Sequence, residues 1–365
     1  MEMKKCRMAI LALYISAVFP AVLCLSSCRT ESRYVSVSGY AQGGTYVLKF
    51  NLAGKDGMSR LSAEEIKHGV DSVLQCIDNS VSGYNKGSIL SRFNAGEAVR
   101  PDSIFIDIYD KSYGYYRMTG TAVDVACAPL FDIWGFGFTT DSLPSPEKVA
   151  KVRSECGMDR LKPRMKPGPD GMVHPEDLLL ESPGADAALP QLNYNAVAQG
   201  YSCDLVAAYL ESAGIYDMLV NIGGEIFCQG VNPGGGPWTV GVDKPVDGND
   251  IPGAELQGIM EAGPEACGVV TSGNYRKFYV KDGRKYAHTV DPRTGCPVTH
   301  SLLSATIIAP DAAEADALAT YCMVVGLEKA VEYIESRADI EGYLIYEKDG
   351  SMCTWSSSGF PLRES

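Results

Sequence analysis

The stretch that decides the fold reads AHTVDPRTGCPVTH (287–300), SLLSATIIAP (301–310) and DAAEADALAT (311–320). Its first part contains the turn dipeptides Asp291-Pro292 and Thr294-Gly295, which predict a tight loop carrying His288, Asp291 and Arg293. The apolar run 302–308 predicts a strand, and Asp311 after a proline predicts the start of a helix. A loop, a strand and a helix are therefore expected in direct succession.

The expected helix carries a carboxylate and a hydroxyl on one face, because Asp316 and Thr320 are four residues apart. Two hard oxygen ligands that face the same way suit Mg²⁺, which takes its other ligands from water and phosphate. The spacing thus indicates a metal site for a phosphorylated ligand. By spacing alone, a solvated helix face remains the commoner interpretation of such a pair.

Outward from this stretch, hairpins alternate with long helices. Helices are expected from the capping box at Ser62 to about Asn79, and over 101–118, 196–212 and 328–337. Strands are expected over 34–40, 45–52, 218–230 (two strands), 238–242, 266–272, 276–281 and 285–288. The run 119–137, taken alone, is typical of a buried helix. Without a βαβ rhythm the pattern predicts an α+β fold with mixed, mainly antiparallel sheets and packed helices.

The N-terminus has the pattern of a bacterial lipoprotein signal. Three basic residues precede an apolar run, 8–25, that ends in Leu-Ser-Ser-Cys at 25–28. Cleavage before Cys28 would remove residues 1–27 and leave a lipidated cysteine, so we expect a membrane-anchored protein that faces the periplasm, at the inner or outer membrane. An uncleaved anchor helix is the alternative.

The rest of the chain is acidic. The full sequence has a formal net charge of −13, and removal of residues 1–27 leaves 29 Lys and Arg against 44 Asp and Glu. This balance excludes a nucleic-acid binder, and a phosphorylated ligand would need a local cation. No linker is visible, so we expect a single domain over 28–365 with the site in a central cleft; a division into two lobes stays open.

Cysteines are numerous but show no metal-binding spacing. Of the 12, Cys6 and Cys24 lie in the signal and Cys28 at its end, and none of the remaining nine forms a CxxC pair. Most lie in apolar runs, as small buried hydrophobic residues do, and whether a disulfide forms stays open.

Eight motifs in order resemble the ApbE family of flavin transferases over nearly the whole chain after the signal. They are GGTY (43–46), 82–94, GTAVD (120–124) with 130–137, AVAQGYSCD (196–204), NIGGE (221–225), TSGNY (271–275), 288–297 and ADALAT (315–320). The resemblance implies an ApbE-like, T-fold-like architecture and an enzyme that transfers FMN from FAD to a Ser or Thr hydroxyl of a target protein and releases AMP.

The resemblance also implies roles for individual residues. The metal ligands would be Asp316, Thr320 and Ala196, the last through its backbone carbonyl. The flavin nucleotide would be held by Gly43, Tyr84, Ala122, Val123, Asp124, Asn193, Gln199 and Val290. An aromatic ring such as Tyr84 can stack on a flat ring, and Asp124 can accept hydrogen bonds from ring or ribose donors.

Three polar residues near the loop are further candidates. His288 is a candidate general base, although a structural hydrogen bond in the turn would explain it equally well. Thr271 and Ser272 could donate to phosphate oxygens, or satisfy the turn at Gly273.

Two other functions stay open from the residues. The same site could hydrolyse FAD to FMN and AMP in a Mg²⁺-dependent way, or a lipoprotein could bind flavin without catalysis. The expected partners are FAD, Mg²⁺, an acceptor protein with an FMN-binding domain, and the membrane through the lipid.

Overall fold

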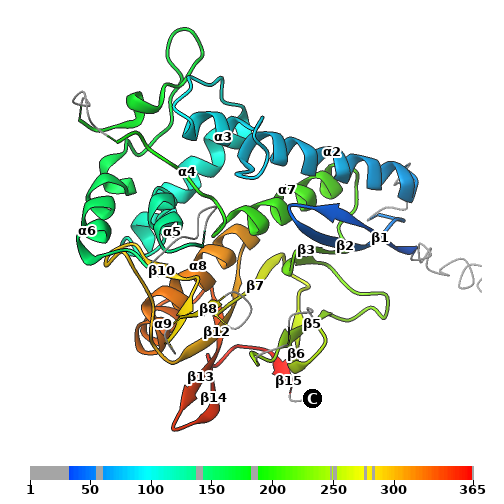
Figure 1. Ribbon diagram of the computed structural model, residues 1–365. Coiled ribbons are helices and arrows are strands. Elements are labelled where there is room, and N and C mark those ends of the chain that lie inside the picture. Colours follow the sequence, from blue (N-terminus) through cyan, green and yellow to red (C-terminus); the bar gives the residue numbers. More distant parts are fainter. Residues whose placement is uncertain are drawn as a thin grey trace, which may run out of the picture.

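The protein is built on one large antiparallel sheet. The structure is a computed structural model that describes residues 33–54, 61–136, 143–181, 188–246, 249, 253–274, 278–281 and 284–363 (Figure 1). Eight strands pair in the order β1-β2-β3-β4-β7-β12-β13-β14, and every neighbouring pair is antiparallel. Their bounds are β1 Tyr34–Ala41, β2 Gly44–Asn51, β3 Met218–Ile222, β4 Glu225–Gln229, β7 Cys267–Gly273, β12 Leu302–Ala309, β13 Glu341–Lys348 and β14 Ser351–Ser356.

Three smaller sheets complete the β structure. They are the three-stranded sheet β15-β6-β5 and the hairpins β8-β9 and β10-β11. Their bounds are β5 Trp238–Asp243, β6 Leu256–Ala262, β8 Phe278–Lys281, β9 Arg284–Ala287, β10 Val290–Asp291, β11 Cys296–Pro297 and β15 Leu362–Arg363. The α+β class with mainly antiparallel strands is confirmed.

The helices of the described residues include α2, α7, α8 and α9, which contact the large sheet, and α7 and α8 run side by side (Figure 1). Their bounds are α2 Ala63–Val81, α3 Ile89–Asn94, α4 Ser103–Met118, α5 Ala128–Ile133, α6 Pro146–Glu155, α7 Ala198–Ser212, α8 Ala312–Val325 and α9 Leu327–Glu335, with 3₁₀ turns at Met158–Arg160 and Pro175–Leu178. The main core lies between the helices that contact the sheet and the sheet itself, and includes Leu48, Val206 and Leu318. A second core, with Cys228, Trp238 and Ile345, joins the other face of the sheet to the three-stranded sheet.

Local sequence signals begin the helices as expected. Ser62 accepts a hydrogen bond from the Glu65 amide, and Glu65 accepts one from the Ser62 amide, which completes the capping box of α2. Asp311 caps α8 by accepting from the Glu314 amide at 2.7 Å. The helical interpretation of 119–137 is wrong for most of that run: within its described part, 119–136, only α5 is helical, and Thr121 has a φ of +73°.

Two glycines place the start of α8 deep in the molecule. A Cβ on Gly200 would lie 2.1 Å from the Ala312 carbonyl oxygen, and a Cβ on Gly268 would lie 2.3 Å from the Ala312 Cα. No side chain fits at either contact, so α7 and β7 can approach the first turn of α8 from two sides only because these residues are glycines. Asp316, one turn further along α8, is thereby carried into the interior.

Candidate functional site

Asp316 lies where α7 and α8 meet. Its side chain is 5 % exposed, and its Oδ2 accepts a hydrogen bond from the Gly200 amide at 3.1 Å. Gly200 is near the N-terminal end of α7, where backbone N–H groups have no partner within the helix. Ala196 precedes this end of α7 in a turn, and Thr320 is half-buried one turn beyond Asp316 on α8. The structure thus brings Asp316 to the helix end that Ala196 precedes.

The charges of two further carboxylates affect the pKa of Asp316. Burial raises the pKa of Asp316 well above its usual value, and Glu225 and Asp204 raise it further, while the Gly200 amide opposes the shift. Glu225 opens β4 after the Gly223-Gly224 turn. Asp204 accepts from the Ala312 and Ala313 amides at 2.8 and 2.9 Å, and burial raises its pKa to about 7. This concentration of negative charge in the interior is costly unless a cation offsets it.

The residues present fit a hard divalent cation. Asp316 offers a charged oxygen, Thr320 a hydroxyl and Ala196 a backbone carbonyl, which are the ligand types that Mg²⁺ takes. Among the described residues, no group of three or more His, Cys, Asp or Glu side chains could hold a metal. The expected ligand set contains only one side chain of these kinds, so it does not depend on such a group.

Two turns that contain glycine pairs lie beside the Asp316 carboxylate. Gly43, at the β1–β2 turn, has a φ of +77° and open space where a Cβ would be, and a Cβ on Gly44 would lie 3.6 Å from the Gly223 Cα. The Gln199 side chain occupies the space beside Gly223, because a Cβ there would lie 2.0 Å from Gln199 Nε2 and 3.2 Å from Glu225 Oε2. Gly43, Gln199 and Asp316 therefore belong to one neighbourhood.

The loop 122–125 forms a second neighbourhood. Ala122 and Val123 are 1 % and 2 % exposed, so their side chains are closed to a ligand and only their backbone groups could contact one. The Asp124 carboxylate accepts from the Ala126 amide at 2.8 Å and the Met158 amide at 3.0 Å. The Asp124 carboxylate, which was expected to accept hydrogen bonds from the flavin nucleotide, therefore already holds its own loop against the segment that contains Met158.

Asn193 connects the two neighbourhoods. Its amide donates to the Val125 carbonyl at 2.7 Å, and its Oδ1 accepts from the Asn195 amide at 2.9 Å. The chain then continues through Tyr194, whose carbonyl accepts from the Ala198 amide at 2.8 Å at the start of α7. One short segment therefore runs from the 122–125 loop to the helix end beside Asp316.

The loop after β9 is held from both sides. Val290 is buried with Cys127 and Leu130, and Trp134 Nε1 donates to the Gly295 carbonyl at 2.7 Å. Arg293 pairs with Asp291 through two nitrogens at 2.9 Å. His288 is half-buried at the start of this loop. The predicted tight turn is confirmed, and it has a fixed place against α5.

The remaining expected residues have different surroundings. Thr271 Oγ1 lies 2.8 Å from Thr306 Oγ1 across β7 and β12, so this hydroxyl has a structural partner. Ser272 is half-buried next to it on β7. Tyr84 is 74 % exposed in the turn after α2, where its ring is open to a ligand. Cys28 lies outside the described residues.

Sequence reasoning assigned no role to Glu225 or Asp204. The signals were present: Glu225 closes the NIGGE motif at a strand–strand turn, and Asp204 is four residues after Gly200. That spacing places Asp204 on the helix face that packs against α8. What sequence could not give is the contact of α7 with α8, which brings the carboxylates together.

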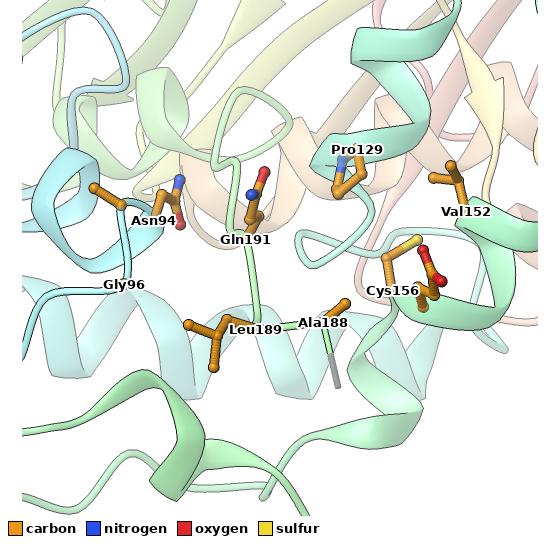
Figure 2. Close-up of a pocket in the computed structure, with 10 residues that line it drawn as sticks. Asn94, Gly96, Pro129, Val152, Cys156, Ala188, Leu189 and Gln191 are labelled. Carbon is orange, nitrogen blue, oxygen red and sulfur yellow. The ribbon is translucent and has the colours of Figure 1, made fainter. Parts of the chain in front are cut away.

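A pocket of about 440 Å³ lies beside the second neighbourhood (Figure 2). It is lined by Asn94, Ala95, Gly96, Pro129, Val152, Glu155, Cys156, Ala188, Leu189 and Gln191. None of the expected site residues lines it, although Gln191 is two residues from Asn193 and Cys156 two from Met158.

Asp124 gives the protein a predicted pH dependence. Burial raises the pKa of Asp124 from 3.8 to about 6, so between these values the folded protein keeps a proton that the unfolded chain has lost. The free energy of unfolding should therefore fall as the pH rises from 4 to 6, by at most about 3 kcal/mol from this group. Urea unfolding at both pH values should show a smaller fall in Asp124→Asn. An equal fall in both proteins would contradict this assignment.

Known proteins resemble this chain over most of its length. A family model described as the ApbE family matches residues 43–344. The FAD:protein FMN transferase of Haemophilus influenzae is 31 % identical over 93 % of this chain and 94 % of its own, and that of Escherichia coli K12 is 32 % identical over 83 % of each.

Solved structures agree with the sequence relatives. The flavin transferase ApbE from Vibrio cholerae superposes with a TM-score of 0.73 at 29 % identity, covering 90 % of this chain and 98 % of that one. The apo form of the Pseudomonas stutzeri flavinyl transferase ApbE gives a TM-score of 0.74 at 28 % identity, covering 90 % and 95 %.

Proposed function

This chain belongs to the ApbE family, and on that premise we propose that it transfers FMN from FAD to a Ser or Thr hydroxyl of an acceptor protein. In the reaction the hydroxyl oxygen forms a bond to the FMN phosphorus, the bond from that phosphorus to AMP breaks, and AMP leaves. The observation that carries the proposal is the buried Asp316, which lies with Glu225 and Asp204 beside the glycine turns at Gly43 and Gly223.

Mg²⁺ is the cation that we propose for this site, held by Asp316, Thr320 and the Ala196 carbonyl. An ion held by these residues would offset negative charge on the pyrophosphate of FAD. The burial of Asp316 supports this assignment, because a carboxylate that is 5 % exposed and close to two others gains much from a cation.

The chain's own residues position the substrate. The positive φ of Gly43 and its open Cβ position leave the β1–β2 turn accessible to the nucleotide. Gln199 offers a neutral amide beside Gly223, and the backbone of Ala122 and Val123 offers hydrogen-bonding groups on a loop that Asp124 fixes. The exposed ring of Tyr84 is a stacking surface for the flavin. We propose that His288, half-buried at the start of the loop after β9, takes the proton of the acceptor hydroxyl.

A comparison of AMP release with and without acceptor tests transfer against hydrolysis. The protein is incubated with FAD and Mg²⁺ alone, and then with a protein that has an FMN-binding domain and an acceptor threonine. Transfer predicts that the acceptor accelerates AMP release and becomes covalently fluorescent. Equal AMP release in both reactions with no bound flavin would instead identify a Mg²⁺-dependent FAD pyrophosphatase, and FAD binding without AMP release would identify a flavin-binding lipoprotein.

We also propose that Cys28 carries a lipid that anchors the protein to a membrane facing the periplasm. The support is the Leu-Ser-Ser-Cys sequence after an apolar run. Over the part of the chain that the structure describes, no helix has both the length and the apolar character needed to cross a membrane.

The Cys28→Ala variant should therefore lack the lipid and lose its membrane attachment. The measurement is detergent partitioning together with the mass of the N-terminal peptide in both proteins. A wild-type N-terminal peptide without lipid, or acylation of the variant at another residue, would contradict the assignment.

A further inference from the structure

Two cysteines meet beside the loop that carries Asp124. Cys127 is 4 % exposed at the start of α5, and the half-buried Cys156, at the end of α6, packs against the small core that Cys127 forms with Leu130 and Val290. The backbone fixes this approach, because the Gly157 amide donates to the Ala126 carbonyl at 3.2 Å. The two cysteines flank this hydrogen bond, since Cys127 follows Ala126 and Cys156 precedes Gly157, and both thiols are free.

The same pair borders the 440 Å³ pocket. Cys156 lies on the Val152 side of the pocket, with Asn94 and Leu189 on the other side (Figure 2). A small molecule that enters the pocket can therefore reach the Cys156 sulfur, whereas Cys127 is covered. The Gly157–Ala126 hydrogen bond holds the two cysteine-bearing segments side by side, and closeness of the two backbones is the first requirement of a disulfide.

We propose that Cys127 and Cys156 form a reversible disulfide in exchange with a low-molecular-weight disulfide that reacts from this pocket. The Cys156 thiolate attacks one sulfur of the reagent and releases the first thiolate. Cys127 then attacks the Cys156 sulfur of the mixed disulfide and releases the second, and the two Cys protons end on the released thiols. Two cysteine thiols are thus oxidised and one reagent disulfide is reduced.

The order of the steps follows from the surroundings of each thiol. The pKa of the Cys127 thiol is raised, first by hydrogen bonding to Cys156, then by burial and by the nearby Asp124 carboxylate. Cys127 is therefore a poor first nucleophile, whereas Cys156 lines the pocket and is only half-buried.

The disulfide would join the loop that carries Asp124 covalently to the segment that carries Met158. Asp124 lies three residues before Cys127, and its carboxylate already accepts from the amide of Met158, two residues after Cys156. A covalent bond between the segments closes a loop of about 30 residues, which restricts the unfolded chain. This inference does not depend on the proposed transferase activity, because its readouts are mass and thermal stability.

The test treats the full chain with oxidised glutathione and then alkylates the unfolded protein. We expect a peptide in which Cys127 is linked to Cys156, two fewer alkylated cysteines than in the reduced protein, and a Tm higher by about 5 °C or more that dithiothreitol reverses. Cys156→Ser and Cys127→Ser should abolish the link and the shift. Cys76→Ser is the matched control. Cys76 is exposed, so its substitution should leave both the disulfide link and the Tm shift unchanged.

Several results would overturn the proposal. One is full alkylation of both cysteines after treatment, and another is a glutathione adduct that stays on Cys156. A third is a link confined to Cys228 and Cys267, which face each other across β4 and β7.

Discussion

The Asp316→Asn variant should release AMP more slowly by on the order of 10³-fold, while its folded state becomes more stable than that of the wild type in a metal chelator. Asp316 is 5 % exposed, and burial and Glu225 raise its pKa. A neutral amide removes this unfavourable charge, and its side-chain oxygen can still accept from the Gly200 amide. The same substitution removes the only charged ligand of the proposed Mg²⁺ site.

The opposite signs of the two effects make this prediction specific, because unfolding cannot explain a loss of activity in a more stable protein. The measurements are AMP release with and without Mg²⁺, and urea unfolding in chelator. Asp316→Ala and chelation of the wild type should also stop the reaction. Glu314→Ala is a matched control on the same helix: Glu314 pairs with Arg337 at 2.8 Å, so its loss should affect stability and spare metal dependence. Wild-type AMP release in Asp316→Ala or in chelator would refute the metal site.

The His288→Ala variant should transfer flavin to a threonine-bearing acceptor about 10²-fold or more slowly, with FAD binding nearly unchanged. His288 is half-buried two residues before Val290, and except for Val290 the residues expected to hold the flavin nucleotide, such as Gly43 and Gln199, lie on other elements. Removal of a general base lowers the rate of the chemical step and leaves the contacts to bound FAD in place.

The measurements for this variant are the rate of covalent flavin fluorescence and, separately, FAD binding by titration. His174→Ala is the control, because His174 lies in a surface segment near Asp170 and Glu176, and it should transfer at the wild-type rate. Little change in transfer by the His288 variant would assign this histidine to a structural hydrogen bond in the turn.

The fold was largely predictable because its signals are local. The strand 302–308, the Asp311 cap and the Ser62 capping box all depend on residues within one turn of each other, and all three are present. The exception is 119–137, where apolar composition resembles a buried helix. Its burial comes instead from an irregular loop, in which Thr119 Oγ1 accepts from the Val123 amide and Asp124 holds Met158. Helix α6 was not predicted, although Ser145 and Pro146 mark its start.

The sequence suggested the candidate site residues one by one, but it could not show how they are arranged in space. The four-residue spacing places Asp316 and Thr320 on one face of α8, and sequence alone could not distinguish a solvated face from a buried one. That distinction depends on Gly200 and Gly268, which let α7 and β7 approach Ala312. The neighbouring charges of Glu225 and Asp204 follow from the same packing, since they come from chain segments distant from α8.

The most direct test of FMN transfer is the intact mass of the acceptor protein after reaction with FAD and Mg²⁺. We expect one added FMN group per acceptor molecule, bound as a phosphoester at the acceptor threonine, with one AMP released for each group attached. An acceptor in which valine replaces that threonine should gain no mass, because it has the same shape without the hydroxyl. An acceptor of unchanged mass while AMP accumulates would contradict the account.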